Sequence, residues 1–306
     1  VYVANERTTD DIVSIQSEGT DGSFAINFNG TSWTVEGKEN FPISSDALSK
    51  LIEKANNLTA ARKISSDGDY EKYGLDNPKT TLTVTDSQGT SIKYVIGNFN
   101  ENINRYYVCE KGSKDIYIIN KSVGDQLTAD INSYAAAFDL SDLSRSTLST
   151  IEIVNGESDT VINKGEKDDN NPLGSSSQWT FGKPFSSSVF VDVNKIDTII
   201  IKLKNAAASQ CVMFSPTESD LENYGLKDSS VCYSLNYSGK NVKMYMGKTN
   251  DDGSAYISFD GSSIVGLADS ETVSALKEYL DPYKYLPQSV CTAKKAAVDS
   301  IEAVSD

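Results

Sequence analysis

The side chains that could do chemistry in this 306-residue sequence are mostly carboxylates, because it contains 43 Asp and Glu residues and no histidine. The commonest general base, the Ser-His-Asp and Cys-His arrangements and the commonest transition-metal ligand are therefore absent. Neither glycine-rich phosphate-binding pattern occurs. Two carboxylates alone can hydrolyse a glycosidic bond, but the spacing singles out no pair. The residue types predict no catalytic residues and leave glycan cleavage as an alternative.

Metal-binding patterns are equally weak. Three short runs, SSDGDYE, EKDDNN and NDDGS, offer clustered oxygen ligands, but none has the twelve-residue calcium loop with its terminal Glu. We interpret them as solvated acidic turns and predict no metal and no cofactor. The four cysteines, Cys109, Cys211, Cys232 and Cys291, match no zinc spacing. Buried free thiols are the favoured interpretation, with one disulfide or a reactive thiol as the alternatives.

The charge of the chain excludes some partners. Its formal net charge is −15, which repels phosphate backbones and anionic lipid surfaces, so we predict no nucleic-acid partner and no electrostatic docking on a membrane. No run of about 18 apolar residues is present. The sequence begins VYVANERTTDD, without a methionine, and we expect that a signal or membrane anchor has been removed.

The segments that must position any site occur twice, as an internal sequence repeat. Five ordered pairs of segments match at an offset of about 150 residues. They are SWTVEG with QWTFGK, NLTAARKIS with NAAASQCVMF, DYEKYGLDNP with DLENYGLKDS, IKYVIGN with VKMYMGK, and RYYVCE with SAYISF. We predict two similar domains, 1–140 and 151–290, joined by a polar linker at 141–150. A tail at 291–306 is predicted to be helical or disordered.

Alternating apolar residues with glycine-containing turns between them predict antiparallel strands, and few helices are expected. The fold class is therefore α+β, with a mainly antiparallel sheet, one main helix and short helical turns in each domain. The main helix begins after Ser44 or Ser45. The matching segment after Asp192 is rich in β-branched residues, yet we predict a helix because its twin is one. The tract 163–177 is predicted to be a polar inserted loop, suited to contact a partner.

The repeated string DYEKYGL/DLENYGL is predicted to form a helical turn capped by its Asp and ended by a left-handed glycine. The following leucine contacts the turn, and the tyrosine wedges the turn against the sheet. A Tyr/Asp ligand pair in each domain is the functional alternative. The two tryptophans are predicted to be core residues at equivalent positions. The structural motif thus comprises Asp69, Tyr73, Gly74, Leu75, Asp220, Tyr224, Gly225, Leu226, Trp33 and Trp179.

These motifs resemble the bacterial domain-of-unknown-function family 4340 (DUF4340), present as two tandem copies. The first copy carries the pattern in Trp33, Tyr73, Gly74, Leu75, Pro78, Gly97 and Tyr107. The second departs from it at Ser229, where the proline is missing. The resemblance supplies no catalytic residues. It implies an extracytoplasmic, membrane-tethered module, such as a lipoprotein, of the kind found beside ABC-transport components.

Two functions are predicted from different classes. In the first, the protein is a non-enzymatic interaction module that serves a transporter or an envelope assembly through a protein partner at the membrane. In the second, it binds or cleaves an envelope glycan and uses exposed Trp or Tyr rings as stacking platforms. Burial of both tryptophans would favour the first function, and an exposed aromatic row beside paired carboxylates would favour the second.

Overall fold

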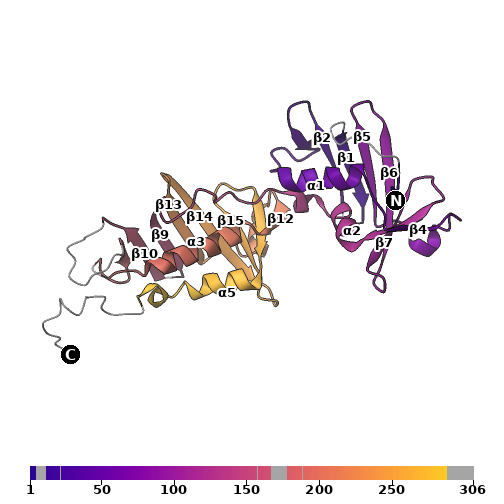
Figure 1. The fold of residues 1–306 in the computed structure, drawn as a ribbon. Helices are drawn as coiled ribbons and strands as arrows, with labels where there is room; N and C mark the ends of the chain where they lie inside the picture. Colours follow the sequence, from indigo (N-terminus) through magenta and orange to yellow (C-terminus); the bar gives the residue numbers. More distant parts are fainter. Residues whose placement is uncertain (5–11, 21, 157, 167–177, 188, 288–306) are drawn as a thin grey trace, which may run out of the picture. The chain divides into compact units, whose positions relative to one another are not determined.

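A computed structural model describes residues 1–4, 12–20, 22–156, 158–166, 178–187 and 189–287. The chain divides into two compact units, Val1–Ala136 and Ala137–Asp306. In each unit the described residues form an eight-stranded antiparallel sheet accompanied by helices (Figure 1). The predicted α+β class is confirmed.

In the first unit the main helix connects the two edge strands of the sheet. Its elements are β1 (Ile12–Gly19), β2 (Gly22–Phe28), β3 (Trp33–Val35), α1 (Ser45–Asn56), β4 (Arg62–Ser65), η2 (Glu71–Tyr73), β5 (Thr80–Asp86), β6 (Ser91–Asn100), β7 (Arg105–Glu110), β8 (Ile116–Asn120), α2 (Lys121–Leu127) and η3 (Ile131–Tyr134). The strand order is β3-β2-β1-β5-β6-β7-β8-β4. Because β3 and β4 are the two edge strands, α1 carries the chain from one edge to the other.

The second unit repeats this arrangement. Its elements are β9 (Leu148–Asn155), β10 (Ser158–Lys164), β11 (Trp179–Lys183), α3 (Val193–Ala207), β12 (Gln210–Phe214), α4 (Glu218–Asn223), β13 (Val231–Tyr237), β14 (Lys240–Thr249), β15 (Ala255–Phe259), β16 (Ile264–Ala268), α5 (Ser270–Glu278) and η4 (Pro282–Tyr285). The order β11-β10-β9-β13-β14-β15-β16-β12 is the order of the first sheet, strand for strand.

The predicted main helices and their caps are confirmed. The Ser44 side chain accepts a hydrogen bond from the backbone N–H of Ala47 at 3.2 Å and caps α1. The Asp192 side chain accepts one from Asn194 at 2.9 Å and caps α3. Three β-branched residues of α3 are compatible with a helix because they lie on its buried face, which comprises Ile196, Ile199, Ile200, Leu203, Ala206 and Ala207.

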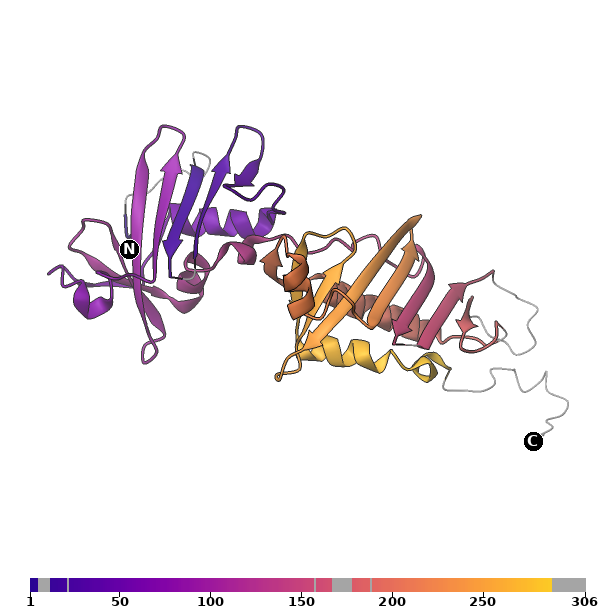
Figure 2. The same ribbon diagram turned by 180° about the vertical axis from the view of Figure 1, so that it is seen from behind.

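Each sheet buries one face beneath its helices. In β9, Ile151 and Ile153 are buried in the core while Glu152 between them is exposed, which is the period-two pattern of a sheet covered on one side. Figure 2 shows the molecule from behind, with α1 and α3 lying beyond the strands of their sheets. On the opposite face of the first sheet, β1 and β5 carry polar residues, whereas Val95 of β6 and Cys109 of β7 pack in a second, smaller apolar cluster.

The division between the units lies earlier than the sequence suggested. It falls between Ala136 and Ala137, so the segment 141–150, predicted as a linker, is part of the second unit. Leu143 is fully buried in that unit's core, and β9 already begins at Leu148. The serines of this segment lie at the surface while its leucines are buried. The prediction of a linker relied on the high serine content and missed the two buried leucines. The predicted tail at 291–306 lies outside the described residues.

Candidate functional site

The repeated string forms a backbone corner in the first unit. Gly74 has a φ of 68°, the left-handed conformation that was predicted. Its N–H donates to the carbonyl oxygen of Glu71 at 3.1 Å, and the N–H of Leu75 donates to Tyr70 at 2.9 Å. This pair of hydrogen bonds is the Schellman motif, which satisfies the last carbonyls of a helical turn.

The second unit makes the same corner at the end of α4. Gly225 has a φ of 67°. Its N–H donates to Glu222 at 3.0 Å, and the N–H of Leu226 donates to Leu221 at 2.8 Å. The left-handed glycines predicted from the sequence are thus present in both units.

The tyrosines of the corners pack on the sheets. The ring of Tyr73 lies 4.8 Å from that of Tyr107 in β7, and the ring of Tyr224 lies 4.4 Å from that of Tyr256 in β15. Leu75 joins a small buried cluster with Val95, Cys109 and Ile116. These side chains have the packing role predicted for them.

The predicted cap of the first corner is wrong. Asp69 is exposed, and the N-cap of η2 is Tyr70, which makes no side-chain capping hydrogen bond. The backbone N–H of Asp69 instead donates to Oδ1 of Asp67 at 3.1 Å. The turn that precedes η2 therefore places Asp69 one residue too early to cap.

The predicted cap of the second corner is also displaced. Thr217, not Asp220, is the N-cap of α4, and Asp220 is the N3 residue of a capping box. Its carboxylate accepts hydrogen bonds from the Thr217 N–H at 2.8 Å and from the Thr217 hydroxyl at 2.6 Å. These hydrogen bonds lower the pKa of Asp220 below its usual value. Asp220 caps the helix, but from the third helical position.

The two tryptophans differ in burial. Trp179 is 2% exposed and belongs to the core of the second unit, as predicted. Trp33 is only half-buried, so the prediction that it is a core residue is wrong. Its ring lies 5.4 Å from that of Phe28, which is 38% exposed. The first unit therefore presents an aromatic pair at the surface, where the second has a buried indole.

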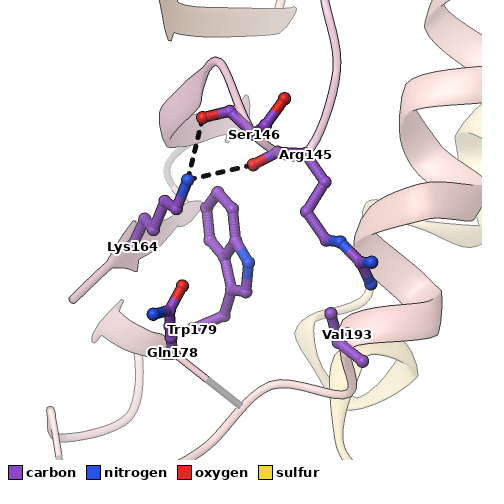
Figure 3. A pocket seen from close by; sticks show the side chains of 6 residues that line it. All are labelled: Arg145, Ser146, Lys164, Gln178, Trp179 and Val193. Carbon is purple, nitrogen blue, oxygen red and sulfur yellow. Dashed lines mark hydrogen bonds between the residues drawn. The ribbon is translucent and has the colours of Figure 1, made fainter. Parts of the chain in front are cut away.

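A cavity of about 460 Å³ opens beside Trp179 (Figure 3). It is lined by Arg145, Ser146, Lys164, Gln178, Trp179 and Val193. Lys164 and Trp179 are register partners on β10 and β11, while Val193 is the first residue of α3. Arg145 and Ser146 come from the segment before β9. Four stretches of the chain thus contribute side chains to this cavity.

Two cationic side chains border this cavity. The Lys164 ammonium donates to the carbonyl oxygens of Arg145 and Ser146 at 3.2 and 2.9 Å (Figure 3). The Arg145 guanidinium forms an ion pair with Asp197 at 3.1 Å. Sequence reasoning did not single out Arg145 or Gln178, and it placed Lys164 in an inserted loop. Most of that predicted loop, 167–177, lies outside the described residues.

No metal centre is apparent in the described part of the chain, where no three His, Cys, Asp or Glu side chains gather closely enough to hold an ion. Cys109 is a buried free thiol and Cys232 a half-buried one, and Cys211 is buried. Burial raises the pKa of Cys109 to about 11, which keeps it protonated and unreactive. Cys291 lies outside the described residues. Among the described helices, none has the length and apolar composition needed to cross a membrane.

Comparison with known proteins identifies a family. The family model of DUF4340, a domain of unknown function, matches residues 33–229. This stretch begins in β3 of the first unit and ends just before β13 of the second, so it does not by itself establish two tandem copies of the family's domain. No curated protein and no solved structure matches significantly. Because the family model covers more than half of the sequence, the chain belongs to the DUF4340 family.

Proposed function

We propose that this protein is a non-enzymatic interaction module that binds a protein partner at the membrane or envelope. The observation that supports this function most is the polar sheet face in each unit. In the first sheet, Gln16, Thr83 and Lys93 are register partners in one row across β1, β5 and β6. This row lies on the side of the sheet opposite to the buried core.

The second sheet carries a comparable row. Glu152, Ser234 and Lys243 are register partners across β9, β13 and β14. Glu152 and Lys243 are exposed, whereas Ser234 is shielded between neighbouring strands. A polar row thus crosses the same three strand positions of both sheets, with a lysine at the same end.

Side chains on the polar face of the first sheet are ordered by hydrogen bonds and an ion pair in the unbound protein. The Ser14 hydroxyl donates to Asn27 at 2.7 Å, and the hydroxyls of Thr85 and Ser91 are hydrogen-bonded at 2.8 Å. Lys93 pairs with Glu18 at 3.1 Å. Side chains that are already ordered lose less conformational entropy when a partner binds. A broad, ordered, polar face suits protein recognition better than enclosure of a small substrate.

The location is the second part of the proposal. The module acts outside the cytoplasmic membrane, is tethered to it, and is accessory to an ABC-type transporter or an envelope assembly. This part rests on the family resemblance. The net charge of −15 adds that a partner with a basic contact surface would be attracted over a long range.

Site-specific photo-crosslinking in the full-length protein in its native membrane tests this function. A crosslinking residue is placed at exposed Gln16 or Glu152 on the open faces, and at exposed Lys50 in α1 or Ile201 in α3 as matched helix-side controls. We expect a discrete crosslinked protein from the open-face positions. Crosslinks from the helix-side positions alone, or none from any of the four, would overturn the proposal.

Envelope-glycan binding or cleavage is the second candidate, and one observation favours it. Phe28 and Trp33 form a partly exposed aromatic pair, and such rings stack on sugars. The buried Trp179 has no such surface in the second unit. A pull-down on purified envelope glycan, with Phe28→Ser compared with the unmodified chain, distinguishes the two functions. Retention of the unmodified chain on the glycan that is lost in Phe28→Ser would favour glycan binding. Release of sugar from the glycan would favour cleavage.

A further inference from the structure

One pair of neighbouring residues on the sheet differs in chemical type between the two units. In the first unit, Phe28 and Trp33 are register partners on β2 and β3, and their rings are 5.4 Å apart. In the second unit, the register partners on β10 and β11 are Lys164 and Trp179. An aromatic ring beside the indole is thus replaced by an aliphatic chain that ends in an ammonium. The cavity of about 460 Å³ lies beside this second pair.

The Lys164 ammonium is held by the backbone of the segment that precedes β9. It donates to the carbonyl oxygens of Arg145 and Ser146, and an ammonium has three hydrogens to donate. One hydrogen is therefore left for an acceptor, and Lys164 lines the cavity. Figure 3 shows the indole of Trp179 standing between the Lys164 ammonium and the side chain of Arg145.

The cavity concentrates positive charge on a chain that is acidic overall. Lys164 and Arg145 contribute two positive charges, and Asp197, 3.1 Å from Arg145, offsets one of them. A guanidinium has five N–H donors, so Arg145 can keep Asp197 and still bind a second acceptor. Trp179 and Val193 form apolar walls, and a low-dielectric wall strengthens the attraction of an anion to nearby cations.

We propose that this cavity binds a small oxyanion, a carboxylate or phosphate group, at its cationic lining, to which Lys164 and Arg145 contribute. The amide of Gln178 and the hydroxyl of Ser146 supply neutral hydrogen-bonding groups beside the two cations. The volume falls within the range of about 300–1,000 Å³ that is typical of small-molecule sites. This site is separate from the open sheet faces and does not depend on the proposed protein partner.

The chain offers a direct optical readout. It contains two tryptophans, so Trp33→Phe leaves Trp179, which lines the cavity, as the sole indole. Its emission is followed while inorganic phosphate or acetate is added, with sodium chloride at equal ionic strength as the control. We expect a saturable change with phosphate or acetate and none with chloride. A polyuronate is titrated in parallel. If the Trp179 emission saturates with this polymer and not with acetate or phosphate, the carboxylate that the cavity binds belongs to a polymer and not to a free solute.

Two substitutions test the assignment of the cations. Lys164→Gln and Arg145→Gln should each weaken binding about tenfold, because each removes a charge-assisted hydrogen bond. Lys183→Gln is the matched control, since Lys183 is an exposed lysine of β11 that pairs with Asp159 outside the cavity. This control should bind as the parent does. Thermal unfolding of each variant verifies that it is folded.

The opposite results are equally clear. A response that rises without saturation and equals that of chloride would overturn the site, as would binding that survives both substitutions unchanged. Isothermal titration calorimetry of the unmodified chain with phosphate, acetate and the polyuronate provides a second measurement that needs no tryptophan substitution. Heat that shows no saturation with phosphate, with acetate or with the polyuronate would also overturn the proposal.

Discussion

Gly97 lies so close to Tyr73 that a Cβ atom on the glycine would overlap the backbone carbonyl oxygen of the tyrosine. Gly247 has the same relationship with Tyr224 in the second unit. In both units a central strand, β6 or β14, therefore passes directly beneath the corner made by the repeated string. The matched glycines join the corner to the sheet by contact between backbones, which explains why both recur in the sequence.

Replacement of these glycines should be costly. Gly97→Ala or Gly247→Ala is expected to lower the free energy of unfolding by about 2 kcal/mol or more, because a backbone oxygen cannot move aside without deforming the corner. Gly89→Ala is the control: Gly89 has a φ of 82° but open space around its Cβ position, so only the left-handed backbone penalises it, by about 1 kcal/mol. Urea unfolding measures all three, and equal losses at Gly89 and Gly97 would contradict the steric explanation.

The unequal burial of the tryptophans predicts unequal access to solvent. A Trp179→Phe variant reports on half-buried Trp33, and a Trp33→Phe variant reports on Trp179, which is 2% exposed. Acrylamide should quench Trp33 several-fold more strongly than Trp179. Fluorescence quenching with each single-tryptophan variant provides the measurement, and equal quenching constants would show that Trp179 is not enclosed by the core.

The sequence was most informative where two copies of a segment could be compared. The stretch that follows Asp192 would pass for a strand by its β-branched residues, and its twin correctly identified the helix α3. The left-handed glycines were also predictable, because a glycine that ends a polar turn has few other uses. These features depend on local chemistry, which a sequence displays directly.

Other features depend on contacts that a sequence does not display. The caps of the two repeated corners were misassigned because several oxygen-bearing residues precede each turn, although the spacing of Thr217 and Asp220 is that of a capping box. The strand order, in which β5 inserts beside β1, is set by packing across the whole sheet. The cavity combines Arg145, Lys164 and Val193 from separate segments, so no local pattern could have predicted it.

The capping box makes one carboxyl group sensitive to acid. Hydrogen bonds from Thr217 lower the pKa of Asp220 in the folded protein below its usual value of 3.8. The cap therefore contributes its full stability above that value and loses it as the pH falls through the lower, folded pKa. Carbon-13 NMR titration should place the Asp220 carboxyl midpoint below 3.8. Thr217→Val, which removes the hydroxyl donor, should move the midpoint upward, and an unchanged midpoint would contradict this cause.

Two buried tyrosines in the core of the second unit are expected to respond oppositely to the loss of a hydroxyl group. Tyr233 and Tyr285 are both 0% exposed. The Tyr233 hydroxyl donates to the carbonyl oxygen of Leu276 at 2.7 Å, whereas the Tyr285 hydroxyl has no hydrogen-bond partner among the described residues. Burial raises the pKa of both above the usual range, so both stay protonated at neutral pH and retain a polar O–H group.

A buried hydroxyl without a partner loses its hydration and gains nothing in return. Tyr285→Phe should therefore raise the free energy of unfolding by about 1 kcal/mol, while Tyr233→Phe should lower it by about 1 kcal/mol because the Leu276 carbonyl is left unpaired. The two variants delete the same atom from the same core, so each is the control for the other. Urea denaturation measures the difference. A Tyr285→Phe variant destabilised as much as Tyr233→Phe would show that the Tyr285 hydroxyl is hydrogen-bonded in solution.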